Sequence, residues 1–103
     1  MSNIDKDVKV KNFIINNNKP FTIIAGPCVI ENRDHALKTA NKIKDICSSL
    51  GLNFIYKSSF DKANRTSLNS SRGPGIHESL EIFNEVKEKI GCPIVTDVHE
   101  KEQ

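Results

Sequence analysis

The feature that most constrains the fold is an alternation along the chain between short apolar runs and longer segments with helical periodicity. The apolar runs are FTIIA at 21–25, LNFIY at 52–56 and CPIVTD at 92–97. Runs that are largely continuous, rather than apolar at every second position, are typical of parallel strands covered on both faces. The order strand, helix, strand, helix, strand therefore predicts an α/β fold with a parallel sheet.

Two segments carry the apolar spacing of amphipathic helices. The first begins after Asn32, a residue type favoured at N-caps, and ends at Gly51. Its apolar positions are Ala36, Leu37, Ala40, Ile43, Cys47 and Leu50. The second ends at Gly91, and its apolar stripe comprises Ile76, Leu80, Phe83, Val86 and Ile90. Residues 98–103, VHEKEQ, are expected to begin a third helix.

The first twenty residues predict a β-hairpin. Val8 and Val10 alternate with polar residues, an apolar stretch follows at 13–15, and an asparagine-rich turn lies at 16–19 before the run at 21–25. We expect two short strands around this turn, with the hairpin region at 8–20. Three parallel strands of this apolarity would leave unpaired sheet edges. We therefore expect a piece of a larger barrel, or a chain that depends on partners.

Composition excludes several classes of protein. The 103 residues suffice for one small domain, and a formal net charge of +2 is too small for a general affinity for nucleic acid or for an anionic membrane. The start of the chain does not resemble a secretory signal, and no run of 18 apolar residues occurs, so a cytoplasmic protein is expected. The three cysteines lack CxxC spacing, which argues against a disulfide framework and against a self-contained zinc site.

All three predicted strands end in residues that are able to take part in chemistry. Cys28 follows the first strand, Lys57 and Ser59 the second, and Asp97 closes the third. Ligands of parallel α/β folds bind at the carboxyl ends of the strands, where the loops converge. We therefore expect a ligand site at this edge of the sheet.

The cysteines differ in what their positions allow. An accessible thiolate at Cys28 would serve as a metal ligand or as a nucleophile, although one thiol cannot hold a metal alone. Cys47 lies on the apolar stripe of the first helix, and Cys92 lies just before the third strand. Both are expected to be small buried hydrophobic residues.

The segment KSSFDKANR at 57–65 is rich in cations. Lys57, Lys62 and Arg65 would neutralise a phosphate or a carboxylate, and Arg65 has the geometry for two parallel hydrogen bonds. Asn64 and Ser59 would bind sugar hydroxyls. The alternative is a solvated loop, since charge runs usually face water.

Asp97 is at an awkward position for an unpaired charge, because it closes a buried strand. Lys57 on the neighbouring strand is its natural partner, and contact with a ligand is equally open. His99 lies closer to the predicted site than His35 and His77, which are near helix starts and are expected to be solvated or capping residues. The segment RGPG at 72–75 reads as a tight loop that enters the second helix rather than as a phosphate-binding loop.

Four motifs, in order, resemble one family. IAGPCVIE, YKSSFDKANRTS, RGPGIHESLEIF and PIVTDVHE, which together span 24–100, are similar to the N-terminal part of 3-deoxy-D-manno-octulosonate 8-phosphate synthases. The resemblance implies a (β/α)8 TIM barrel, usually a homotetramer, with an N-terminal β-hairpin that closes the barrel bottom. This chain would hold the hairpin and about the first three βα units (21–103) of a single barrel domain, whose remainder is absent.

The family is a transferase of lipopolysaccharide and KDO biosynthesis, and it condenses phosphoenolpyruvate with D-arabinose 5-phosphate to form 3-deoxy-D-manno-octulosonate 8-phosphate and phosphate. Carried over residue by residue, the resemblance implies that Lys57 and Lys62 help to hold phosphoenolpyruvate. It implies that Asn64 and Arg65 engage arabinose 5-phosphate, with Arg65 at the phosphate group.

The resemblance also implies that Ser59 and Asp97 line this site and that Lys57, Lys62 and Asp97 are its catalytic residues. Cys28, in AGPC, corresponds by this resemblance to a cysteine that provides one ligand to a divalent ion in the metal-dependent branch of the family. The metal-independent branch has asparagine at this position. The remaining metal ligands, a histidine, a glutamate and an aspartate, would lie outside this chain.

Three alternatives remain. The related synthase that uses erythrose 4-phosphate shares a GPC-type strand end, but it has a Lys-Pro-Arg-Thr type of sequence at the second strand, so KSSFDKANR favours the octulosonate enzyme. A truncated or split-gene product would be inactive, at most an anion-binding α/β piece. A nucleotide-binding α/β protein is disfavoured because the glycine fingerprint is missing after the first strand.

Overall fold

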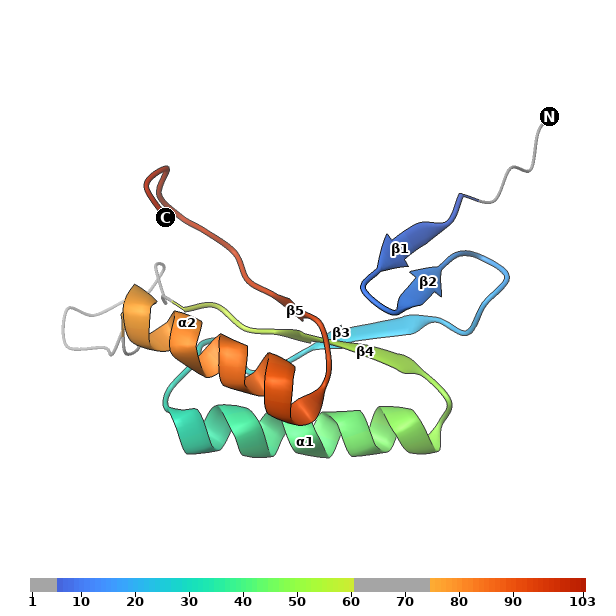
Figure 1. Cartoon of the computed structure of the whole chain (residues 1–103), viewed down its shortest axis with the longest axis horizontal. Coiled ribbons are helices and arrows are strands. Elements are labelled where there is room, and N and C mark those ends of the chain that lie inside the picture. The colour runs from blue at the N-terminus through green and yellow to red at the C-terminus, as the bar shows by residue number, and fades with distance from the viewer. Residues whose placement is uncertain (1–5, 61–74) are drawn as a thin grey trace.

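The computed structural model describes residues 6–60 and 75–103 as a small α/β structure (Figure 1). Its elements in chain order are the strands β1 (Val8–Val10), β2 (Phe13–Ile15) and β3 (Thr22–Ala25), the helix α1 (Arg33–Ser49), the strand β4 (Asn53–Lys57), the helix α2 (Ile76–Glu85), the π-helical turn η1 (Val86–Ile90) and the strand β5 (Ile94–Val95). β1 and β2 pair in an antiparallel ribbon, and β3, β4 and β5 form a parallel sheet in that order. The predicted parallel sheet is confirmed.

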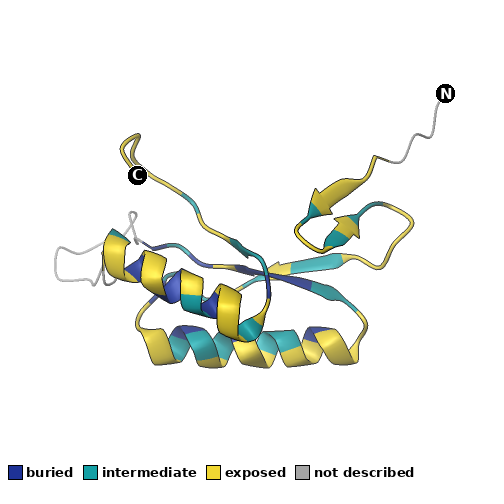
Figure 2. Cartoon of the chain, viewed as in Figure 1, coloured by how far each residue is buried: buried dark blue, intermediate teal, exposed yellow. Residues whose placement is uncertain are grey.

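Both helices cover the same face of the parallel sheet, and the opposite face carries no helix in the described part of the chain (Figures 1 and 2). The side chains of a strand alternate between the two faces. Phe54 and Tyr56 belong to the buried core against the helices, whereas Ile24 is 56% exposed and Val95 is 40% exposed. Ile55 of β4, on the face opposite to Phe54 and Tyr56, is only 7% exposed. Among the described residues, the expectation that the strands are covered on both faces therefore holds at the centre of β4 and is wrong at Ile24 and Val95.

The core lies between the central strand and the two helices. Tyr56 of β4 is fully buried, and its ring meets Phe83 of α2 edge to face, with 6.3 Å between the ring centroids. Ala36 and Ala40 are fully buried on α1, where their small size brings the helix close to the sheet. β4 thus occupies the centre of both the sheet and the core.

The predicted ends of the first helix are confirmed. Asn32 is the N-cap, and its Oδ1 accepts a hydrogen bond of 2.8 Å from the backbone N–H of His35. Gly51 follows the C-cap with φ of +70°, a left-handed conformation that glycine adopts without strain. The apolar spacing placed Leu50 on the buried face of α1, but Leu50 is the C-cap and is 66% exposed.

The second helix differs from its predicted stripe. Ser79, Ile82 and Phe83 are the buried residues of α2, whereas Leu80 is 54% exposed. Because a helix turns 100° per residue, the stripe through 79, 82, 83 and 86 excludes position 80. Gly91 ends the helical segment with φ of +79°. The predicted end of this helix at a glycine is confirmed.

The predicted hairpin turn is at the wrong place. The two-residue loop that joins β1 to β2 consists of Lys11 and Asn12, and Lys11 takes the positive φ of +50° that such a tight loop needs. Asn16 does form a turn, since its Oδ1 accepts from the N–H of Asn18 at 2.8 Å. That turn joins β2 to β3, which pair with different strands.

The predicted third helix is absent from 98–103, which form bends and a turn. Oε1 of Gln103 accepts hydrogen bonds from the backbone N–H groups of His99 and Glu100, at 2.8 Å and 3.0 Å. Six residues are also too few to stabilise an isolated helix. In the described ranges, no helix has the length and apolarity that crossing a membrane requires.

Candidate functional site

The carboxyl edge of the sheet is built by two segments that run side by side beyond β3 and β4. The backbone N–H of Ser59 donates to the carbonyl of Cys28 at 3.1 Å, and the carbonyl of Ser59 accepts from the N–H of Ile30 at 2.8 Å. Val29 and Ser59 form a parallel β-bridge. The pairing of the two strands thus continues past their ends, and it fixes the backbone on both sides of Ser59.

Gly26 permits this close approach. A Cβ atom built on Gly26 would lie 1.9 Å from the carbonyl oxygen of Lys57, a distance at which no side chain fits. The neighbouring Ser58 is 2% exposed, and its Oγ donates to the carbonyl of Pro27 at 2.8 Å. Sequence reasoning assigned no role to Ser58. The signal was its position after a buried strand, where a small hydroxyl has to find a backbone acceptor.

Lys57, Ser59 and Asp97 lie on the same side of this edge. Lys57 pairs with Val95 in the sheet, and Ser59 and Asp97 each follow two residues later, which is the spacing of one strand face. This is the face without helices. The structure therefore brings three of the residues predicted for the site onto one accessible surface, with Lys57 exposed.

Among the described residues, the carboxylate of Asp97 lies close to the side chains of Ser59 and His99. Its Oδ1 accepts a 2.6 Å hydrogen bond from Oγ of Ser59, and its Oδ2 lies 3.6 Å from Nε2 of His99. The bond from Ser59 is the main cause that holds the pKa of Asp97 below its usual value; the charges of His99 and Lys57 act more weakly in the same direction. The direct partner of Asp97 is thus Ser59 rather than the predicted Lys57. The signal that points to the histidine is its position two residues after Asp97 in the chain.

The cysteines divide as predicted into one exposed and two buried thiols. Cys28 is exposed next to Ser59, whereas Cys47 and Cys92 are 4% and 3% exposed in the core. Burial raises the pKa of the Cys92 thiol, which favours its neutral form. Within 6–60 and 75–103, no cluster of three histidine, cysteine or acidic side chains could hold a metal ion.

Part of the predicted site lies outside the described residues. Lys62, Asn64 and Arg65 belong to 61–74, as do the first three residues of RGPG. Gly75, the last residue of that motif, is the N-cap of α2 with φ of +99°. The exposed His77 follows in the first turn of that helix, in agreement with its predicted solvation.

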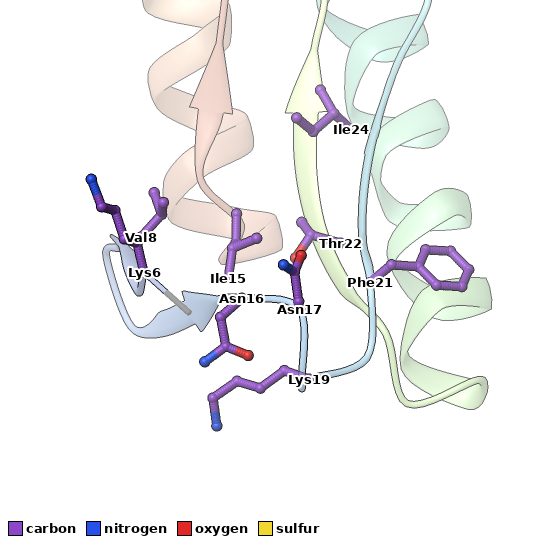
Figure 3. Close-up of a pocket in the computed structure, with 9 residues that line it drawn as sticks. All are labelled: Lys6, Val8, Ile15, Asn16, Asn17, Lys19, Phe21, Thr22 and Ile24. Atoms are coloured by element: carbon purple, nitrogen blue, oxygen red, sulfur yellow. The ribbon is translucent and has the colours of Figure 1, made fainter. Parts of the chain in front are cut away.

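A groove of about 730 Å³ lies at the other end of the sheet, between the hairpin and the start of β3 (Figure 3). Val8 and Ile15 line it from the hairpin, and Thr22 and Ile24 from β3. Its lining contains two lysines but no histidine, cysteine or carboxylate. Of the predicted site residues that the structure describes, none lines this groove.

Comparison with known proteins identifies the family. Residues 3–103 match the sequence profile described as the DAHP synthetase I family. The chain belongs to this family. It is 53% identical over 103 residues to the 2-dehydro-3-deoxyphosphooctonate aldolase of Bartonella henselae. The matched region is 100% of this chain and 37% of that relative. A protein of the same name from Rickettsia felis is 56% identical over 100 residues, 97% of this chain and 36% of the relative.

These relatives confirm the resemblance drawn from the four motifs. Within the DAHP synthetase I family, the similar proteins carry the name of the octulosonate enzyme. The chain spans little more than a third of the length of the curated relatives that it matches.

Proposed function

We propose that this chain contributes to a 3-deoxy-D-manno-octulosonate 8-phosphate synthase, which condenses phosphoenolpyruvate with D-arabinose 5-phosphate and water. The observation that carries this proposal is the identity of 50–56% to proteins named 2-dehydro-3-deoxyphosphooctonate aldolase. The gathering of Lys57, Ser59 and Asp97 on one open face at the carboxyl edge supports it. Parallel α/β folds bind their ligands at the carboxyl ends of the strands.

The reaction forms one carbon–carbon bond between C3 of phosphoenolpyruvate and the aldehyde carbon of the sugar. Water adds at C2 of phosphoenolpyruvate, and phosphate leaves with cleavage of the bond between C2 and oxygen. Both substrates are anionic, so cations that hold them side by side supply proximity and neutralise charge. Lys57 is suited to this task because it is a cationic residue that is exposed on the sheet face without helices.

The segment that follows Lys57 supplies the remaining contacts of this proposal. Lys62 would join Lys57 at phosphoenolpyruvate, and Asn64 and Arg65 would engage the sugar phosphate, with the guanidinium at its phosphate group. A guanidinium can donate two parallel hydrogen bonds to a phosphate, which fixes its orientation. These roles come from the resemblance of KSSFDKANR to the family.

A divalent metal ion is part of the same proposal. Cys28 fits one ligand position because its thiol is exposed at the carboxyl edge, next to Ser59. The other donors would come from elsewhere in the whole protein. When bound, the ion would orient or polarise the reacting groups. A closed (β/α)8 barrel, a homotetramer and a cytoplasmic location belong to the proposal as well.

A hybrid protein tests the proposed function. In this hybrid, the 103 residues replace the segment of the Bartonella henselae relative that they match. With a divalent metal, phosphoenolpyruvate and arabinose 5-phosphate, the hybrid should release phosphate at a rate comparable with the unaltered relative. Erythrose 4-phosphate in place of arabinose 5-phosphate is the control substrate. A folded hybrid that releases no phosphate, or that prefers the four-carbon sugar, overturns the proposal.

A further inference from the structure

Ser59 has a different task from the one that its sequence context predicts. A serine hydroxyl carries a single proton, and that of Ser59 is donated to Oδ1 of Asp97 over 2.6 Å. We propose that Ser59 is a positioning residue, which aims the carboxylate of Asp97 at the substrate instead of donating to the substrate itself. The inference rests on the proposed function for its kinetic part only.

The backbone of Ser59 is fixed on both sides. Its N–H donates to Cys28, its carbonyl accepts from Ile30, and the residue forms a β-bridge with Val29. Its hydroxyl therefore projects from a rigid point of the sheet edge toward Asp97. Asp97 lies two residues beyond the short strand β5, in a stretch that is neither helix nor strand, where no strand pairing restrains its backbone. The hydrogen bond from Ser59 thus restrains the side chain of Asp97 relative to β4.

The second oxygen of the carboxylate is also oriented. Nε2 of His99 lies 3.6 Å from Oδ2 of Asp97, so the two oxygens face different side chains. The side chain of Asp97 is 41% exposed, and lone pairs on both oxygens remain available to a ligand. The charged groups that act on Asp97 are His99 and Lys57, and both favour its ionised form.

An ionised carboxylate accepts hydrogen bonds and repels anions. Phosphoenolpyruvate carries a carboxylate and a phosphate but no hydroxyl donor, whereas the sugar phosphate offers several hydroxyl groups. The oriented Asp97 therefore serves the sugar phosphate. Loss of its orientation should weaken the binding of that substrate and leave the binding of phosphoenolpyruvate unchanged.

The first experiment needs no activity. In the 103-residue chain, NMR follows the titration of the Asp97 carboxyl group. Ser59→Ala should raise the pKa of Asp97 toward that of an ordinary aspartate, and Ser59→Thr, which keeps the hydroxyl, should restore the lowered pKa. Ser58→Ala is the matched control, because the hydroxyl of Ser58 bonds to Pro27. An unchanged pKa in Ser59→Ala overturns the inference.

The second experiment uses the hybrid protein. Ser59→Ala should raise the KM for arabinose 5-phosphate about tenfold, the effect of losing one hydrogen bond of about 1.4 kcal/mol. The KM for phosphoenolpyruvate should stay constant, and Ser59→Thr should recover the loss. In an Asp97→Asn background, Ser59→Ala should add little. Additive losses would show that Ser59 contacts the substrate itself.

The two experiments separate the two proposals. A hybrid without phosphate release refutes the proposed function, whereas the NMR titration still decides whether Ser59 controls Asp97. An active hybrid in which Ser59→Ala leaves both the titration and the KM unchanged refutes the positioning role alone.

Discussion

The substitution Gly26→Ala should disrupt the carboxyl edge of the sheet. The added Cβ would lie 1.9 Å from the carbonyl oxygen of Lys57 and 2.8 Å from its carbonyl carbon. Ordinary contact begins at 3.4 Å, so the two backbones would have to separate by about 1.5 Å. Neither atom belongs to a flexible side chain that could move away. The strain therefore falls on the pairing of the segments beyond β3 and β4.

The cost follows from what this separation breaks. Overpacking of a well-packed site costs about 1–3 kcal/mol. The hydrogen bonds from Ser59 to Cys28 and from Ser58 to Pro27 join the same two segments, and each contributes about 1 kcal/mol. We expect the free energy of unfolding to fall by about 3–5 kcal/mol, a large part of the stability of an ordinary domain.

Equilibrium denaturation in urea, followed by circular dichroism, measures this loss. Gly51→Ala is the matched control, because Gly51 has φ of +70° with no atom within 4 Å of an added Cβ. It should cost only the backbone strain of a left-handed alanine, about 1–2 kcal/mol. If Gly26→Ala unfolds at the same urea concentration as Gly51→Ala, or at a higher one, the steric reasoning is refuted.

Three further outcomes are expected. Asn32→Ala should lower the free energy of unfolding by about 1 kcal/mol, because the first turn of α1 loses its cap, and Asn32→Ser should restore most of it in the same urea assay. A maleimide should label Cys28 in the folded chain and reach Cys47 and Cys92 only in denaturant, as mass spectrometry would detect; rapid labelling of all three would contradict their burial. The lowered pKa of Asp97 contributes stability that is present above the ordinary pKa of an aspartate and lost as the pH falls through the lowered value. Asp97→Asn should therefore flatten the acid limb of the pH–stability curve.

The features that could be predicted from the sequence depend on local physics. Asn32 caps α1 because its side chain satisfies a free N–H of the first turn, and Gly51 and Gly91 follow helices because they adopt positive φ. The continuous apolar runs predicted the parallel sheet for a similar reason. In each case the residue type and its near neighbours determine the outcome.

The features that failed depend on contacts between distant segments. The asparagine-rich turn at 16–19 was recognised, but a turn does not determine which strands pair on either side of it. Leu80 fits an apolar spacing as well as Ile82 does, and only the position of the sheet decides which of them is buried. The contact between Ser59 and Asp97 needs the register that pairs Lys57 with Val95, which no local pattern reveals.

The open face of the sheet connects the fold to the proposed function. Ile24 and Val95 are exposed on the same face as Lys57, with Lys57 at the carboxyl end of its strand. Apolar side chains along a strand and a cation at its end make a poor solvent surface, but they suit the interior of the closed barrel that we propose for the whole protein. There the inward side chains fill the core in layers, and the uppermost layer meets the ligand. The same face would then stabilise the fold through Ile24 and bind an anion through Lys57.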